Sequence, residues 1–171
     1  MNKRFQKYFI LLLIAFFAQS CSYTFTGASI PPGMKTVSVQ LFENNAPFVV
    51  PNLTVQLTEG FRDRIRNQSS LDVVKSEGDG NFEGRITDYS NKPISVQTSE
   101  ATAKGQERLS ITISVKYTSS LDPKTSFETS FTRFQDYTLT NGTFQRQEQE
   151  LIKKIIVQLT EDMFNKAFAN W

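Results

Sequence analysis

The feature that most restricts the fold of this chain is a strict two-residue alternation at residues 109–117. Because successive side chains of a strand point to opposite faces, this run predicts a strand whose two faces meet different surroundings. A turn at residues 121–124 and a second strand at 127–137 then complete an antiparallel hairpin. The odd positions hold Leu109, Ile111, Ile113, Val115 and Tyr117, and the even positions hold Ser110, Thr112, Ser114 and Lys116.

Two other segments, residues 52–67 and 144–168, repeat their apolar residues at helical spacing and so predict helices. Each apolar stripe needs one surface to cover, and one face of a sheet would serve both. With further strands at 35–42, 71–75 and 82–90, the order predicts an α+β two-layer sandwich: two helices packed on one face of a mixed four- to five-stranded sheet. The stripes comprise Leu53, Leu57, Phe61 and Ile65, and then Ile152, Ile155, Ile156, Leu159 and Met163, extended by Phe164, Phe168 and Trp171.

The second face of this sheet is expected to be polar, since residues 110–116 offer hydroxyls and an amine, and Glu128, Ser130 and Thr132 can extend the face on the partner strand. One interpretation is an ordinary solvated sheet face. The other is a surface that docks against a polar partner, such as the lumen of an outer-membrane barrel. Phe134 breaks the parity of its strand, which indicates either a bulge or a strand with two apolar sides.

The N-terminus has the three parts of a bacterial export signal: basic residues at 3, 4 and 7, an apolar run at 9–18, and small residues before Cys21. The run is too short to cross a bilayer. Cys21, the only cysteine, sits where a bacterial lipobox places it, so residues 1–20 are expected to be removed and Cys21 to carry acyl chains such as palmitate. An ordinary cleaved signal with a chance cysteine is the alternative. Residues 21–34 would form a lipidated tether, and residues 35–171 a single α+β domain.

Composition excludes several classes of function. Without the signal, 16 Lys and Arg stand against 17 Asp and Glu, so no basic excess favours nucleic acid. The chain has no histidine, and lipid would occupy its only thiol, which removes the usual nucleophilic triads and zinc sites. A hydrolase using paired carboxylates remains as an alternative, with Glu59/Asp63 and Glu161/Asp162 as the closest pairs. We therefore expect a protein that is not an enzyme and uses no metal or cofactor.

Several segments together resemble the LptE lipopolysaccharide-assembly lipoproteins of Bacteroidetes-type bacteria. They are residues 25–32 (FTGASIPP), 35–39 (KTVSV), 42–47 (FENNAP), 82–89 (FEGRITDY) and 162–171 (DMFNKAFANW). None of them is a chemical motif, and the specificity of the resemblance lies in their order and in the match at both ends. The resemblance implies two helices on a mostly four-stranded sheet, in agreement with the pattern above.

The resemblance also implies a function. Proteins of this family plug a β-barrel partner, LptD, and help to deliver lipopolysaccharide to the outer leaflet of the outer membrane. The expected location is the periplasmic face of the outer membrane, since Ser22 rather than an acidic residue follows Cys21. The alternative is a free periplasmic lipoprotein, such as an activator of a cell-wall synthase. Basic residues suit lipopolysaccharide phosphates. The candidates are Arg108 and Lys116 first, then Arg85, Arg133, Lys92 and Lys104.

Overall fold

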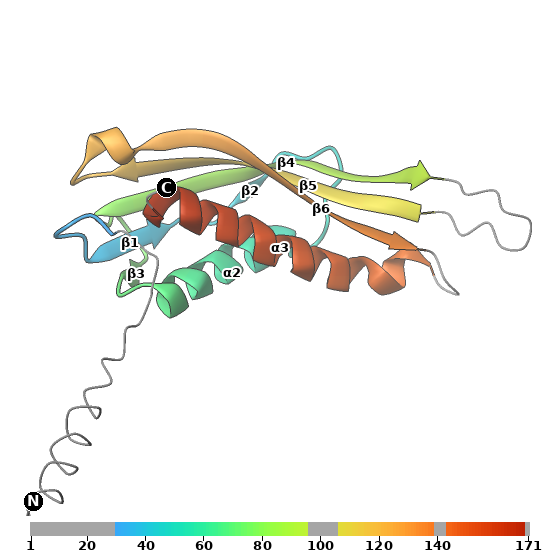
Figure 1. The fold of residues 1–171 in the computed structure, drawn as a ribbon, viewed down its shortest axis with the longest axis horizontal. Coiled ribbons are helices and arrows are strands. Elements are labelled where there is room, and N and C mark those ends of the chain that lie inside the picture. The colour runs from blue at the N-terminus through green and yellow to red at the C-terminus, as the bar shows by residue number, and fades with distance from the viewer. Residues whose placement is uncertain (1–29, 96–105, 139–142, 170–171) are drawn as a thin grey trace, which may run out of the picture.

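The computed structural model of the protein describes residues 30–95, 106–138 and 143–169, and it has two layers. Helices α2 (Leu53–Gln68) and α3 (Phe144–Phe168) lie side by side against one face of a six-stranded sheet, as Figure 1 shows. No described element covers the other face. The expected α+β class, with both helices on one face of a mixed sheet, is confirmed.

The sheet has the order β3-β1-β4-β5-β6, with β2 pairing to β4 beside β1. Strand β1 runs parallel to both β3 and β4, whereas β4, β5 and β6 form an antiparallel meander, so the sheet is mixed. The strands comprise β1 (Thr36–Val39), β2 (Glu43–Asn44), β3 (Asp72–Val74), β4 (Gly80–Ser95), β5 (Gln106–Ser119) and β6 (Phe127–Thr138); a short 3-10 turn, η1 (Pro123–Thr125), lies between β5 and β6.

The alternation at residues 109–117 forms the centre of β5 and places its odd-numbered side chains in the core. All five are almost completely buried, while the even-numbered side chains point to the open face. The register between β5 and β6 continues without a break from Tyr117–Phe127 to Gln106–Thr138. Phe134 therefore lies on the open face of a regular strand, and no bulge is present there. The register shifts in this part of the sheet lie in β4, between Ile86 and Asp88 and between Pro93 and Ser95.

Strand β1 is shorter than the predicted strand at 35–42, because its pairing with β4 ends at Val39, followed only by a hydrogen bond from the N–H of Gln40 to the carbonyl of Phe82. Phe42 turns into the core, and its backbone N–H donates to the buried hydroxyl of Thr58 on α2 at 3.1 Å. The chain then returns to the edge of β4 as β2. The prediction was wrong at this end because the alternation of residues 37–41 does not reveal that Phe42 fills a space over Gly84.

The two helices agree closely with their predicted ranges. Asn52 precedes α2 with a positive φ of 62° and makes no side-chain capping bond. The helices approach each other closely at Gly60, where a Cβ would lie 3.1 Å from Ile156. Arg64 adds a polar link, donating to the hydroxyl of Thr160 and the carbonyl of Val157 on α3. Phe164 and Phe168 are buried in the core as expected, and Trp171 lies outside the described residues.

Strand β4 extends beyond the predicted strand at 82–90 in both directions, from Gly80 to Ser95. Pro93 pairs with β5 on one side only, at an edge of the sheet, which is where a residue without an N–H is tolerated. The signal peptide, Cys21 and most of the tether fall outside the described residues. Met34, at the end of the tether, is buried beside Tyr117. Neither helix in the described ranges is apolar enough over a sufficient length to cross a bilayer.

Candidate functional site

The candidate site is the open face of β4, β5 and β6, opposite the helices. The even-numbered side chains of β5 point to this face, and so do the side chains of the β4 and β6 residues that pair with them. Its basic side chains are Arg85, Lys92, Arg108 and Lys116, and its carboxylates are Glu83, Asp88, Glu128 and Asp136. Four positive groups therefore meet four negative ones, and the face as a whole is polar and close to neutral.

At the end nearer the β5–β6 turn, the charges form a cross-strand cluster. Glu83, Lys116 and Glu128 lie opposite one another on the three strands. The Lys116 amine is 3.9 Å from the Glu83 carboxylate, and the Arg85 guanidinium is 3.6 Å from that of Glu128. All four side chains are about half exposed, so each pair contributes little to stability and can exchange partners.

At the other end, Arg108 binds Asp136 through two hydrogen bonds of 2.6 and 2.8 Å. The pKa of Arg108 is raised and the pKa of Asp136 is lowered, and the hydrogen bonding between the two side chains is the largest cause of both shifts. The guanidinium also lies 3.7 Å from the centre of the exposed Phe134 ring, a cation–π contact. Lys92 faces Arg108 across β4 and β5, and has no carboxylate partner within the described ranges.

Between these two charged ends lies a stretch of hydroxyl groups. The side chains of Thr112 and Thr132 are 2.9 Å apart and share one hydrogen bond. Ser110 and Ser114 flank Thr112 on β5, and Ser130 flanks Thr132 on β6. Hydroxyls both donate and accept, so this stretch can meet water, sugar or a polar protein surface without a fixed charge preference.

The structure brings three of the four leading lipopolysaccharide-contact candidates onto one face: Arg85, Arg108 and Lys116. Lys92 joins them there, and Lys104 lies outside the described residues. Arg133 is different, because it shares the helix side of β6 with Phe131. The sequence prediction grouped these residues by charge alone, and only the strand parity separates Arg133 from the others.

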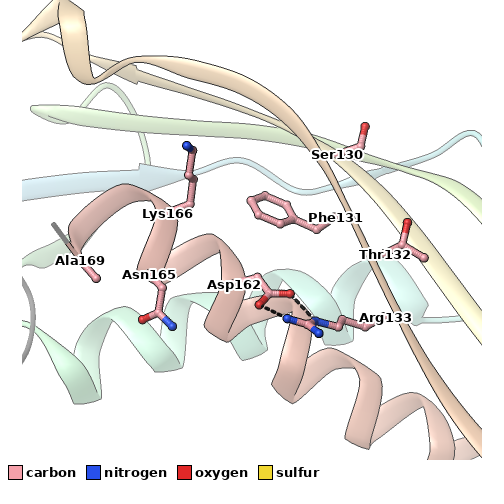
Figure 2. Close-up of a pocket in the computed structure, with 8 residues that line it drawn as sticks. All are labelled: Ser130, Phe131, Thr132, Arg133, Asp162, Asn165, Lys166 and Ala169. Atoms are coloured by element: carbon pink, nitrogen blue, oxygen red, sulfur yellow. Dashed lines mark hydrogen bonds and ion pairs between the residues drawn. The ribbon is translucent and has the colours of Figure 1, made fainter. Parts of the chain in front are cut away.

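Arg133 lies in an open groove between β6 and α3, shown in Figure 2. Its guanidinium makes two hydrogen bonds of 2.5 Å to Asp162 on α3. The groove is also lined by Phe131, Asn165, Lys166 and Ala169. Asp162 was expected to be an ordinary charge on a helix surface, and no spacing in the sequence indicates that it reaches a strand residue 29 positions away.

Three of the four carboxylates considered for catalysis, all but Glu161, take part in ion pairs on helix surfaces. Glu59 binds Arg62 and Asp63 binds Arg66 within α2, while Asp162 binds Arg133. Across the described ranges, His, Cys, Asp and Glu residues form no group placed to hold a metal ion. These carboxylates stabilise surface structure, and nothing in their arrangement activates a nucleophile.

One exposed feature was not singled out from the sequence. Phe48 and Val49, in the loop between β2 and α2, are each 69% exposed, and the Phe48 ring stacks loosely on Tyr89. Pro47 and Pro51 flank them, and the loop carries no charge from Asn44 to Asn52. The apolar run at residues 46–51 is the only sequence signal that could have indicated this loop.

Comparisons with known proteins agree with this architecture. A family described as LptE, lipopolysaccharide-assembly, matches residues 34–167. Among curated proteins none matches the chain significantly. The fold is similar to that of rare lipoprotein B from Shewanella oneidensis (TM-score 0.56, 12% identity, covering 77% of this chain and 92% of that one). It is also similar to a hypothetical protein from Chlamydia trachomatis (TM-score 0.55, 9% identity, covering 80% of this chain and 99% of that one). A minor lipoprotein from Acinetobacter baumannii is similar as well (TM-score 0.50, 15% identity, covering 78% of this chain and 91% of that one).

Proposed function

The chain belongs to the LptE lipopolysaccharide-assembly family, and from this membership we propose that it is an outer-membrane lipoprotein that plugs an LptD-like β-barrel and assists it in delivering lipopolysaccharide to the outer leaflet. In this proposal, acylated Cys21 holds the protein at the periplasmic face of the outer membrane. The folded domain then enters the barrel. The role requires recognition between surfaces and no catalysis.

The observation that carries the proposal is the open face of β4, β5 and β6. A globular protein can leave such a face in water, but this one combines balanced charges with a central stretch of hydroxyls. The interior of a membrane barrel is polar. A hydroxyl-rich face with balanced charges can form hydrogen bonds with such a wall. Lys92, which has no carboxylate partner among the described residues, would need an acidic group on the wall, because burying an unpaired charge is costly.

Lipopolysaccharide contact is the second part of the proposal. Arg85, Arg108 and Lys116 each have a carboxylate neighbour, so an incoming phosphate would compete with Glu128, Asp136 and Glu83. Phosphate forms strong charge-assisted bonds with arginine, and the weaker pairs at 3.6 and 3.9 Å should exchange most readily. Arg133 would act separately, from the groove beside α3.

Affinity purification of the full-length, lipidated protein tests the plug. We expect a large barrel protein to be recovered in equal amount. Ser114→Trp, which places a bulky ring in the centre of the open face, should abolish recovery of the barrel. Lys153→Trp, at an exposed position of α3, is the matched control and should retain it. Recovery of the native protein without any barrel would refute the proposal.

Depletion of the protein separates the proposed role from that of a cell-wall synthase activator. A plug predicts loss of lipopolysaccharide from the cell surface, whereas an activator predicts cell-wall defects with normal surface glycolipid. The location is tested by Cys21→Ala, which removes the acylated thiol. This variant should leave the outer-membrane fraction, and an unchanged distribution would contradict the lipid anchor.

A further inference from the structure

Strand β6 forms an edge of the sheet, and although it carries the charged residues Glu128, Arg133 and Asp136, it has no bulge, proline or lysine to block pairing. The opposite edge is formed by β3, which has only three residues. The free part of β4 carries Lys92 and Pro93. Strand β6 instead runs for 12 residues with neither proline nor lysine. A long edge without such residues is a ready template for pairing with another strand.

Hydrogen bonds elsewhere in the sheet show which backbone groups of β6 point outward. The N–H of Gln40 donates to the carbonyl of Phe82, and the N–H of Asn45 donates to the carbonyl of Ile86. The backbone groups of these even-numbered β4 residues therefore point toward β1 and β2. The backbone N–H and C=O groups of Glu83 and Arg85 must then point toward β5, where these residues pair with Lys116 and Ser114.

The same alternation carries through β5. The backbone N–H and C=O groups of its odd-numbered residues point toward β6, where these residues pair with odd-numbered residues such as Phe131 and Arg133. The even-numbered residues of β6 therefore direct their N–H and C=O groups away from the sheet. Thr138 supports this assignment, because its carbonyl points out of the sheet and accepts a hydrogen bond from the Gln147 side chain on α3. For the others, no described residue supplies a backbone or side-chain partner; these are Glu128, Ser130, Thr132, Phe134 and Asp136.

The groove beside this edge can receive the side chains of an added strand. Phe131 and Ala169 give it apolar surface, and Asn165 and Lys166 give it polar groups (Figure 2). Arg133 and Asp162 satisfy each other across the groove. Lys166 has no carboxylate within ion-pair distance in the described part of the chain, and its amine lies 5.8 Å from the Phe127 ring. The groove thus favours a side chain bearing a negative charge.

A second copy of the chain does not suit this edge. Two β6 strands can pair antiparallel with greatest overlap in two registers. The register centred on Thr132 places Glu128 opposite Asp136, and the register centred on Arg133 places that arginine opposite itself. Like charges directly opposite each other destabilise strand pairing.

We infer that the β6 edge binds an extended segment of a different protein, about nine residues long, as an additional strand of the sheet. A carboxylate on the segment would meet Lys166, and its backbone would pair with the outward-pointing groups of residues 128–136. The edge is distinct from the open face, so the inference does not depend on which protein the open face binds.

Photo-crosslinking in living cells tests this inference. A photoreactive phenylalanine analogue is placed at Ser130, on the open-face side of the edge, or at Asn165, in the groove on the helix side. A segment docked along the edge reaches both positions, whereas a partner on the open face reaches only Ser130. Mass spectrometry should identify the same segment of one partner from both probes.

Substitutions at Thr132 provide the matched pair of variants. Thr132→Pro removes one outward N–H and adds a ring at the edge, so it should reduce both crosslinks about tenfold. Thr132→Ser keeps both the N–H and the hydroxyl and should leave the crosslinks unchanged. Thermal melting of both variants checks the fold, and Ser130→Pro with the probe at Asn165 repeats the test at a second site.

Three results would overturn the inference: crosslinks that resist both proline variants, crosslinks to a second copy of this chain, or no crosslink from Asn165. The last result, obtained while a barrel still co-purifies, would reject the edge and leave the proposed plug intact. Loss of the barrel with persistent crosslinks from both probes would reject the proposed plug and leave the inference about the edge intact.

Discussion

Gly84 on β4 leaves the space that the Phe42 ring occupies. A Cβ at Gly84 would lie 2.2 Å from Cε1 of Phe42, far inside van der Waals contact. Phe42 is almost fully buried, and it lies where the chain leaves the sheet between β1 and β2. This contact joins an irregularity at the sheet edge to the middle of the core.

Gly84→Ala is therefore expected to destabilise the protein by about 2–3 kcal/mol, because the added methyl overpacks a filled site. Urea unfolding measures the change. In the background of Phe42→Ala, which removes the ring, the same substitution should cost less than about 1 kcal/mol, as expected for two coupled residues. Equal costs in both backgrounds would show that the ring moves aside freely.

Thr58→Val is expected to cost about 1–3 kcal/mol, because it leaves the buried N–H of Phe42 without an acceptor while nearly preserving shape. Thr54→Val is the control on the same helix. The Thr54 side chain makes no hydrogen bond to another described residue, so its loss should change the unfolding free energy by less than about 0.5 kcal/mol. A similar effect at both positions would indicate a helix-propensity effect.

Asp79 should make stability depend on pH in the acid range. Hydrogen bonds from the backbone N–H groups of Lys35 and Thr36, and then from the Thr36 hydroxyl, lower the pKa of the Asp79 carboxyl below 3.8. A lowered pKa means that its stabilisation is complete above the unfolded-state value and is lost as pH falls through the folded-state value.

The corresponding variant is Asp79→Asn. Its melting temperature should lie below that of the native protein at neutral pH, and the difference should shrink as pH falls below about 3.8. Differential scanning calorimetry at several pH values measures both. A difference that stays constant down to acid pH would show that the carboxylate charge is not responsible.

Neutralising the open-face cations should affect ligand contact more than folding. Arg108→Gln and Lys116→Gln should each change stability by less than about 1 kcal/mol, since their ion pairs are solvent-exposed. If the proposed contact with phosphate holds, each should weaken lipopolysaccharide binding severalfold and reduce its salt dependence. Lys154→Gln, an exposed and paired cation on α3, is the matched control. An equal loss of binding in the control would indicate a non-specific charge effect.

The fold class, the two helices and the two faces of β5 can be predicted from the amino-acid sequence. These follow from local periodicity: spacing of about four residues forms one helical stripe, and alternation divides a strand between core and exterior. The sequence also identified the open face as polar before any strand had been placed. The expected order of elements followed from the same patterns.

Which charged side chains pair with each other depends on the three-dimensional packing. Arg133 and Asp162 are brought together by the packing of β6 on α3, and Arg108 and Asp136 by the register of two strands. The early end of β1 likewise depends on a space over Gly84 and on the hydroxyl of Thr58. Local periodicity places a residue on a face, but its partner is set by register and packing between segments far apart in the chain, and no local pattern encodes that distance.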